Sequence, residues 1–200
     1  MSPPSPTTPS DEVRDSIEKR WLAVPLQAAH PIADFRSGVE ELDRFLRNLA
    51  LENEVRGIGR TFVLLRDPTD SPDFPEILGF YTLSMGTIPS ADLQPHLGGR
   101  LPRYPIGVGL VARLANDVRV RRRGIGKLLL HDAVGRISVA SSHLGCVGAA
   151  TDAKDETARD FYVRNGFVEL PNTAWPRRLY LPITTIRKLL ISEGAHSEVH

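Results

Sequence analysis

The chain has 200 residues, of which 41% are hydrophobic, and a formal net charge of +1 at pH 7. This length suits one domain with its own core, and no stretch reaches the roughly 18 apolar residues that a membrane-spanning helix needs. The single cysteine, Cys146, excludes an internal disulfide and fits a reducing compartment, and the first residues lack a signal-peptide pattern, so we expect a cytoplasmic protein.

The two ends of the chain differ in composition from the rest. Residues 1–10 contain four prolines among small polar residues, and such a segment has little apolar surface to bury. We therefore expect residues 1–19 to be a disordered or loosely attached leader, residues 20–188 to be a single domain, and residues 189–200 to be a flexible tail. The body holds 23 basic and 18 acidic residues, which permits an anionic partner such as nucleic acid without requiring one.

The first part of the body predicts a strand and an amphipathic helix. Residues 21–26 are expected to form the strand, and a Ser-x-x-Glu capping box from Ser37 to Glu40 is expected to start the helix. The apolar face of this helix is expected to consist of Val39, Leu42, Leu46 and Leu49. Its other sides are expected to carry Glu41, Asp43, Arg44 and Arg47.

Three further strands are predicted in the middle of the chain. Residues 61–65 and 77–85 are apolar or rich in β-forming residues, and the Asp and Pro content of residues 67–75 indicates a hairpin loop between them. Residues 106–118 form the third strand. Two glycines at its N-terminal end indicate a bulge or the close approach of another part of the chain, because glycine otherwise weakens a strand.

Helices and strands alternate in the last part of the chain. A helix is predicted over residues 128–140, because apolar residues recur there every four positions, namely Ile125, Leu129, Ala133 and Ile137. A buried strand is predicted over residues 146–151. This order of elements predicts an α/β (α+β) fold in which helices cover one mixed sheet.

The predicted elements continue to residue 183. A second late helix is expected over residues 155–165, with Asp155 as its N-cap and Gly166 at its end. Strands are expected over residues 167–170 and 178–183.

The loop before the first late helix is the most informative segment of the sequence. It reads Arg121-Arg122-Arg123-Gly124-Ile125-Gly126-Lys127. Two glycines let the backbone approach a ligand, and the start of a helix offers unpaired amides and the positive end of its dipole to an anion. The spacing matches neither Gly-x-Gly-x-x-Gly nor Gly-x4-Gly-Lys-Ser/Thr. The loop therefore predicts a pyrophosphate site outside the dinucleotide-binding and nucleotide-triphosphatase classes.

Three segments together resemble the core of the GCN5-related N-acetyltransferases (GNAT). They are Leu114-Ala115-Asn116-Asp117-Val118, Arg121-x-x-Gly124-x-Gly126 and Ala158-Arg159-Asp160-Phe161-Tyr162-x-x-x-Gly166-Phe167. The resemblance implies a mixed, mostly antiparallel central sheet that splays between its fourth and fifth strands, here residues 106–118 and 146–151. It also implies that acetyl-CoA binds there, with its pantetheine arm between the two strands and its pyrophosphate on the basic loop.

The resemblance also implies the residues of the coenzyme site. These are Leu114, Ala115, Asn116, Val118, Arg121, Arg122, Arg123, Gly124, Ile125, Gly126, Lys127, Thr151 and Phe161. The oxyanion of the reaction would be held by backbone amides near residues 114–116. Consecutive residues point in different directions, so the three arginines of the loop need not all touch the coenzyme.

Tyr162 is the catalytic residue that the resemblance implies. Attack on a thioester ends with a departing thiolate that needs a proton, and a phenol with a pKa of about 10 can supply it. The alternative role for this tyrosine is to pack the helix against the sheet.

A closer resemblance, over most of residues 20–188, is to the acetyltransferase toxins of bacterial toxin–antitoxin pairs, which acetylate the amino group of aminoacyl-tRNA. It is carried by Phe35, Leu42-Asp43-x-Phe45-Leu46, Arg60-Thr61-Phe62-Val63, Leu101-Pro102-Arg103-Tyr104-Pro105, Arg113-Leu114-Ala115, Asp152-Ala153 and Leu181-Pro182-Ile183. This resemblance implies aminoacyl-tRNA as a substrate, a ribbon-helix-helix antitoxin as a partner, and a homodimer.

The residues themselves favour an α-amino acceptor. The strand over residues 107–118 offers no Glu or His as a base. A lysine amine, with a reference pKa of about 10.4, needs such a base, whereas an α-amine near 7.7 to 8.0 is already partly neutral. A base from a distant loop stays open. The candidate contacts for the acceptor or for tRNA phosphates are Arg44, Arg47, Arg100, Arg103 and Arg113.

Two other functions stay open at this point. The chain could acetylate an amine of a protein or of a small molecule, or it could be a regulatory module that binds coenzyme A without turnover. The histidines show no metal-ligand spacing, so no metal is predicted.

Overall fold

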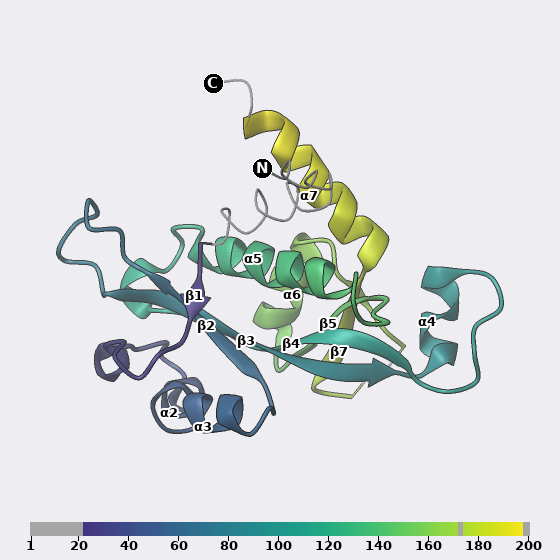
Figure 1. Ribbon diagram of the computed structural model, residues 1–200, viewed down its shortest axis with the longest axis horizontal. Coiled ribbons are helices and arrows are strands. Elements are labelled where there is room, and N and C mark those ends of the chain that lie inside the picture. Colours follow the sequence, from purple (N-terminus) through teal and green to yellow (C-terminus); the bar gives the residue numbers. More distant parts are fainter. Residues whose placement is uncertain (1–21, 172–173, 198–200) are drawn as a thin grey trace, which may run out of the picture.

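A seven-stranded sheet organises the protein. The computed structural model describes residues 22–171 and 174–197, and the strand order is β1-β2-β3-β4-β5-β7-β6 (Figure 1). Neighbouring strands are antiparallel except β4 and β5, which are parallel. The predicted mixed, mostly antiparallel sheet is therefore confirmed. No helix in this described part of the chain is both long enough and apolar enough to cross a membrane.

The elements lie close to their predicted positions in most cases. The strands are β1 (Val24–Pro25), β2 (Arg60–Leu65), β3 (Ile77–Ile88), β4 (Ile106–Asn116), β5 (Gly148–Ala153), β6 (Val168–Glu169) and β7 (Arg177–Pro182). The helices are α2 (Glu40–Asn48), α3 (Ala50–Val55), α4 (Ser90–Leu97), α5 (Ile125–Ala140), α6 (Glu156–Arg164) and α7 (Ile183–Ser197), with two 3-10 turns, η1 (Ile32–Asp34) and η2 (Val118–Val120).

Three helices, α3, α4 and α7, were not predicted from the sequence. Helix α4 contains Pro95, which disrupts a helical pattern, and α7 runs across the predicted boundary at residue 188. Residue 21 of the first predicted strand and the leader, residues 1–19, lie outside the described residues. The predicted domain limits therefore stay a prediction.

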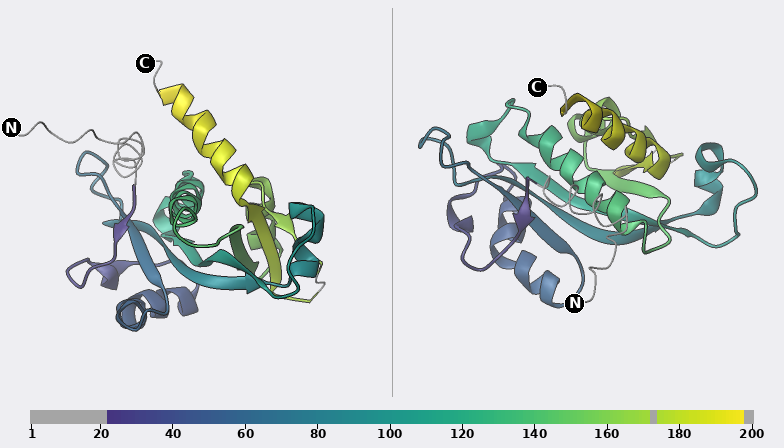
Figure 2. Two further views of the ribbon diagram at one scale, coloured as in Figure 1. Left: turned by 45° about the vertical axis from the view of Figure 1, so that its right-hand side comes forward. Right: turned by 45° about the horizontal axis from the view of Figure 1, so that its top comes forward.

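The sheet separates two groups of helices (Figures 1 and 2). Helices α5, α6 and α7 pack on one face against a core that includes Tyr81, Leu129 and Leu179. Helices α2 and α3 cover the opposite face at the β2–β3 end, around Phe80. Helix α4 covers that same face at the β5–β7 end, around Tyr180. Because strand side chains alternate, each central strand contributes to both layers.

The start of helix α2 differs from its predicted form. The helix begins at Glu40, three residues after Ser37, and Glu40 does not close a capping box. Asp43 takes that role instead, because its buried carboxylate accepts hydrogen bonds from the backbone amide and the hydroxyl of Ser37 at 2.7 and 2.5 Å. Asp43 is thus buried, while Val39 and Leu49 of the predicted apolar face are exposed. The sequence assigned Asp43 to the wrong side of the helix because its buried contact with Ser37 overrides the hydrophobic pattern, and Val39 and Leu49 flank the helix as its cap residues.

The predicted splay between the fourth and fifth strands is present. Strands β4 and β5 are joined by two residue pairs within the described chain, Gly109 with Ala149 and Leu110 with Ala150. The register of β4 against β3 also shifts just beyond this point. A Cβ on Gly109 would lie 2.7 Å from the side chain of Ile137 on α5, so this glycine allows the close approach that the sequence predicted. Beyond Leu110 no described residue pairs as a strand with the outer edge of β4.

Strand β5 tolerates no side chain at Gly148. A Cβ there would overlap the carbonyl oxygen of Leu181 on β7 and would lie 2.7 Å from the ring of Tyr180. We expect Gly148→Ala to lower the free energy of unfolding by about 2 kcal/mol, because overpacking forces the two strands apart. Gly145→Ala is the matched control, since no atom lies within 4 Å of the place that its Cβ would take and it should leave stability unchanged. Urea unfolding of both variants measures the difference, and equal midpoints would contradict the close β5–β7 contact.

Candidate coenzyme and acceptor site

A buried carboxylate fixes the turn that leads from β4 to α5. The side chain of Asp117 is completely buried and accepts hydrogen bonds from the backbone amides of Arg36 and Arg119, both at 2.9 Å. The guanidinium of Arg119 donates two more, at 2.8 and 2.9 Å, and also contacts Asp34 at 2.8 Å. Burial alone would raise the pKa of Asp117, but these hydrogen bonds outweigh it and hold the pKa below its usual range.

The basic loop has the backbone geometry of an anion site. Arg122 and Gly124 both lie in the left-handed region, with φ of 61° and 82°, and helix α5 begins at Ile125. The carbonyl of Gly124 accepts hydrogen bonds from the amides of Lys127 and Leu128 at 2.9 and 3.1 Å. The first-turn amides of Ile125 and Gly126 have no acceptor within the helix. They lie at the positive end of the helix dipole, where an anionic ligand is stabilised.

The three arginines of the loop point in different directions, as the sequence predicted. Arg121 turns back and donates a hydrogen bond to the carbonyl of Ser37 at 2.7 Å. The guanidinium of Arg123 lies 4.6 Å from the ring centre of Phe74. Arg122 is exposed. The guanidinium groups of Arg121 and Arg123 are therefore partly committed to the protein, and Arg122 and Lys127 extend into solvent around the helix start.

Three segments that are distant in sequence meet at Gly126. A Cβ on this glycine would lie 3.5 Å from the ring of Phe161 on α6 and 3.8 Å from Oδ1 of Asn116 at the end of β4. The structure thus brings together the loop and two of the other residues that the resemblance implied for the coenzyme site.

The side chains of the remaining predicted coenzyme residues have mixed surroundings. The side chain of Leu114 is partly buried against the α5 core, and that of Ala115 is buried in the α2 core. Val118 is part of η2 and is 37% exposed. Thr151 is buried and donates a hydrogen bond across the splay to the carbonyl of Val111 at 3.0 Å.

Tyr162 lies at the same opening. Its side chain is buried between the rings of Phe161 and Phe167, with centroid distances of 5.1 and 5.4 Å. Burial raises the pKa of the Tyr162 hydroxyl, and a hydrogen bond with Thr151 offsets part of this rise. The hydroxyl is therefore protonated at neutral pH and can act as a proton donor beside the splay.

The five arginines predicted for the acceptor do not form one surface. Arg113 stacks on the ring of Phe45 at 3.7 Å, and burial lowers its pKa. Arg47 pairs with Glu40 at 3.4 Å, and Arg44 is exposed on the same helix, α2. Arg100 and Arg103 are exposed in the loop between α4 and β4, at the other end of the sheet (Figure 1).

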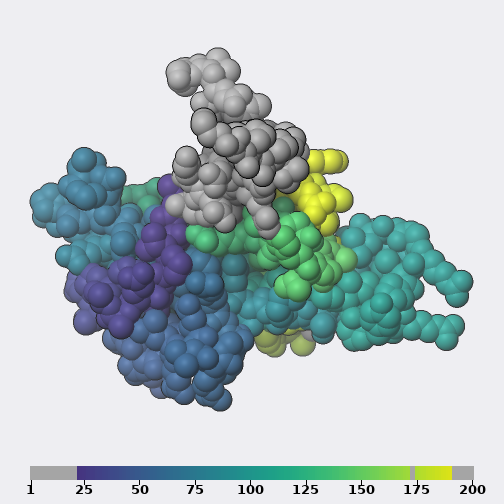
Figure 3. Space-filling view, viewed as in Figure 1, coloured from purple at the N-terminus to yellow at the C-terminus, as the bar shows by residue number. Residues whose placement is uncertain are grey.

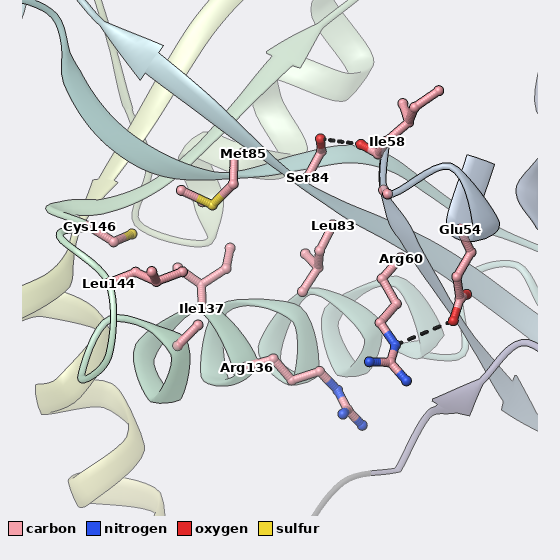
Figure 4. A pocket seen from close by; sticks show the side chains of 14 residues that line it. Glu54, Ile58, Arg60, Leu83, Ser84, Met85, Arg136, Ile137, Leu144 and Cys146 are labelled. Atoms are coloured by element: carbon pink, nitrogen blue, oxygen red, sulfur yellow. Dashed lines mark hydrogen bonds and ion pairs between the residues drawn. The ribbon is translucent and has the colours of Figure 1, made fainter.

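One cavity of the described structure lies away from these residues. It has a volume of about 540 Å³ and lies between the α3–β2 turn, strand β3 and the C-terminal half of α5, where Met85, Ile137 and Leu144 meet (Figure 4). None of the predicted coenzyme residues lines it. Several of the predicted coenzyme residues lie instead around the opening between β4 and β5. Among the described residues, no group of three or more His, Cys, Asp or Glu is arranged to hold a metal ion.

Two polar residues of functional interest were missed from the sequence. Asp117 lies within one of the motifs, and Asp152 lies within another, but neither received a role. Their partners are distant in sequence: Arg36 is 81 residues from Asp117, and Arg178 is 26 residues from Asp152. Asp155, by contrast, caps α6 as predicted, with a 2.8 Å hydrogen bond from the amide of Ala158.

The space-filling view shows that the described surface is uneven (Figure 3). The segment around α4 projects from one end of the molecule, and the loop over residues 66–76 projects from the other. The loop that carries Arg100 and Arg103 belongs to the α4 projection, which makes those two arginines accessible to a large partner.

Comparisons with known proteins agree with this geometry. No protein-family model matches the chain. The chain is 35% identical over 162 residues to the tRNA-acetylating toxin of Mycobacterium tuberculosis, a match that covers 81% of this chain and 92% of that protein. The solved structure of AtaT complexed with acetyl-methionyl-tRNAfMet has a TM-score of 0.71 at 26% identity, over 84% of this chain and 98% of that one.

A second solved structure brings a coenzyme and a partner into the comparison. It is a mutant AtaT toxin bound to the C-terminus of the antitoxin AtaR and to acetyl-CoA. It has a TM-score of 0.68 at 25% identity, over 84% of this chain and 96% of that one.

Replacement of Asp117 tests whether its network holds the loop in place. We expect Asp117→Asn to lower the free energy of unfolding at pH 7 by about 3 kcal/mol, because it leaves Arg119 without its buried partner. We also expect binding of coenzyme A to weaken about tenfold, as measured by calorimetry. An unchanged affinity in a folded variant would show that the network does not position the loop.

The same variant predicts a change in acid stability. The folded-state pKa of Asp117 lies below its unfolded value, so its stabilisation is present above about pH 4 and disappears as the pH falls through the folded pKa. The wild-type protein should therefore lose stability more steeply below about pH 4 than Asp117→Asn. Thermal unfolding between about pH 2.5 and 7 measures both slopes, and parallel curves would contradict the assignment.

Proposed function

Because the chain belongs to the family of GNAT-fold tRNA-acetylating toxins, we propose that it transfers the acetyl group of acetyl-CoA to the α-amino group of an aminoacyl-tRNA. The observation that carries this proposal is the convergence of the basic loop and the protonated Tyr162 hydroxyl on the opening between β4 and β5. The reaction would block translation, because an acetylated α-amine can no longer form a peptide bond.

The residues of the chain fit acetyl-CoA. The first-turn amides of α5, together with Arg122 and Lys127, would hold its pyrophosphate. The outer edge of β4 beyond Leu110 would offer backbone amides to the pantetheine arm and to the oxyanion. When bound, acetyl-CoA supplies the thioester that is cleaved.

Tyr162 would complete the reaction on the protein side. Its buried hydroxyl donates a proton to the departing thiolate, and the surrounding phenylalanine rings exclude water from that proton transfer. No Glu or His lies on β4, so the acceptor amine arrives at least partly neutral. An α-amine meets this requirement near neutral pH, and a lysine amine does not.

We also propose the biological setting of the reaction. The relatives include a toxin bound to the C-terminus of its antitoxin, and we extend an antitoxin partner, of the ribbon-helix-helix class, to this chain. A homodimer and action in the cytoplasm complete the proposal. Co-purification with the product of an adjacent small gene, and the mass in solution, would test the partner and the dimer.

Removal of one hydroxyl tests the catalytic role of Tyr162. We expect Tyr162→Phe to lower kcat for acetylation of bulk aminoacyl-tRNA at least about 100-fold, while the affinity for acetyl-CoA changes less than about twofold. Tyr180→Phe is the matched control, because it removes the hydroxyl of another buried tyrosine, which donates a hydrogen bond to the carbonyl of Val147 at 2.8 Å, and it should keep kcat. Transfer of radioactive acetyl groups to tRNA measures both variants. Undiminished turnover of Tyr162→Phe would remove this residue from its role.

The exposed arginines next to α4 offer a test of tRNA binding. We expect the double variant Arg100→Gln, Arg103→Gln to weaken tRNA binding and to reduce the slope of log K against log salt by about 1 for each phosphate that the protein no longer neutralises. The double variant Arg56→Gln, Arg164→Gln removes equal charge from exposed positions elsewhere and should preserve the slope. Filter binding at several KCl concentrations measures both. Equal slopes in the two variants would exclude this loop as a tRNA-binding segment.

A further inference from the structure

Strand β5 presents different residues to the two faces of the sheet. Ala149 and Ala153 lie in the core beneath α5 and α6, whereas Ala150 lies in the core beneath α4. Because successive side chains alternate, Thr151 belongs to the α5–α6 side and Asp152 to the opposite side. Thr151 is hydrogen-bonded with Tyr162 and crosses the splay to Val111. Asp152 therefore directly follows Thr151, the residue that contacts Tyr162, and lies on the opposite face of the sheet.

Asp152 carries a carboxylate with a fixed orientation. Arg178, its register partner on β7, donates two hydrogen bonds to its two oxygens, at 2.7 and 2.6 Å. Arg178 is itself anchored by the carbonyl of Thr87 at 3.3 Å. Both members of the pair are 34% exposed, so the carboxylate keeps accessible lone pairs. A bidentate arginine restricts a carboxylate more than a single ammonium would.

The acceptor has to approach from the face that Asp152 occupies. The basic loop, α6 and Tyr162 occupy the α5 side, which is where the coenzyme is placed. On the opposite face, α2 and α4 cover the two ends of the sheet and leave the splay between them. Lys154, two residues after Asp152, contacts Glu41 of α2 at 2.6 Å, so the wall of this opening includes α2. An amine that enters here passes the end of β5.

We propose that Asp152 binds the α-amino group of the acceptor and that Arg178 holds the Asp152 carboxylate in position for it. This inference rests on the proposed function. Within that reaction, it gives Asp152 the role of selecting an acceptor that carries an amine. An isolated carboxylate would stabilise the ammonium form strongly and would oppose its attack on the thioester. The paired carboxylate carries less net charge, so it orients the N–H groups of the amine with a smaller bias toward the charged form.

Binding of tRNA that ends in an amine or in a hydroxyl isolates this contact. The probes are bulk aminoacyl-tRNA and the same pool converted to α-hydroxyacyl-tRNA with nitrous acid, each bound to protein saturated with coenzyme A at about pH 6, where the α-amine is charged. Because the tRNA bodies are the same, the ratio of the two dissociation constants reports on the α-substituent. We expect the wild-type protein to bind the amine about fivefold more tightly, the size of a partly exposed ion pair.

Asp152→Asn should bring this ratio to within about twofold of unity and should raise the KM for aminoacyl-tRNA. Asp152→Glu keeps the charge and should restore part of the preference. Glu169→Gln is the control, because Glu169 is also held by arginines, Arg159 and Arg177, but lies on the edge strand β6. It should keep the wild-type ratio. If Asp152→Asn does not fold, Asp152→Ser replaces it.

The possible outcomes separate the two proposals. Acetylation of aminoacyl-tRNA by the wild-type protein, with the same ratio in a folded Asp152 variant, overturns the role of Asp152 and leaves the proposed function standing. Equal weakening of both tRNA forms in the Asp152 variant also overturns it, because that result indicates a structural role alone. Failure of the wild-type protein to acetylate any aminoacyl-tRNA overturns the proposed function itself.

Discussion

The buried carboxylate of Asp117 is the constraint on which the rest of the site depends. A charge in a protein interior is costly unless it is paired and hydrogen-bonded, and Asp117 achieves this with four donors from Arg36 and Arg119. Those donors come from two segments, the turn after η1 and η2 itself. Satisfying the one carboxylate therefore fixes where β4 ends, how the chain reverses, and where the amides of α5 point.

The splay follows from the same part of the sheet. A regular β4–β5 pair would use all of its backbone groups in a ladder, whereas here two pairs hold the strands and the remaining edge of β4 is available. The neighbouring strands compensate for the missing pairs. Strands β3 and β4 pair from Gly79 to Ile88, and β5 pairs with β7 along its whole length. Pairing with β3 thus stabilises β4, and pairing with β7 stabilises β5. The two strands therefore need no continuous ladder between them.

The parts of the fold that the sequence predicted depend on local patterns. The periodicity of Leu129, Ala133 and Ile137 predicted α5, and the glycine–arginine loop predicted the anion site, because both signals lie within one segment. The predictions that failed involve long-range polar contacts or a local exception. At the start of α2, the buried Asp43 and not Glu40 accepts the hydrogen bonds of Ser37. Helix α4 was missed because it contains Pro95, which disrupts a helical pattern. The pairs Asp117–Arg36 and Asp152–Arg178 join strands and turns that a single sequence does not place side by side.

In this proposal, the coenzyme site and the acceptor site lie on opposite faces of the sheet, and strand β5 contributes residues to both. Thr151 is hydrogen-bonded with Tyr162, which would protonate the thiolate, and Asp152 lies on the side from which an amine would come. The two faces of β5 pack against different helices, so a substitution on one face can leave the packing of the other face unchanged. The sequence and structure of the basic loop therefore carry no information on which amine is the acceptor. In this proposal, specificity for the acceptor comes from the face between α2 and α4, where contacts hold the polar side chains of Arg113, Asp152 and Arg178 in place.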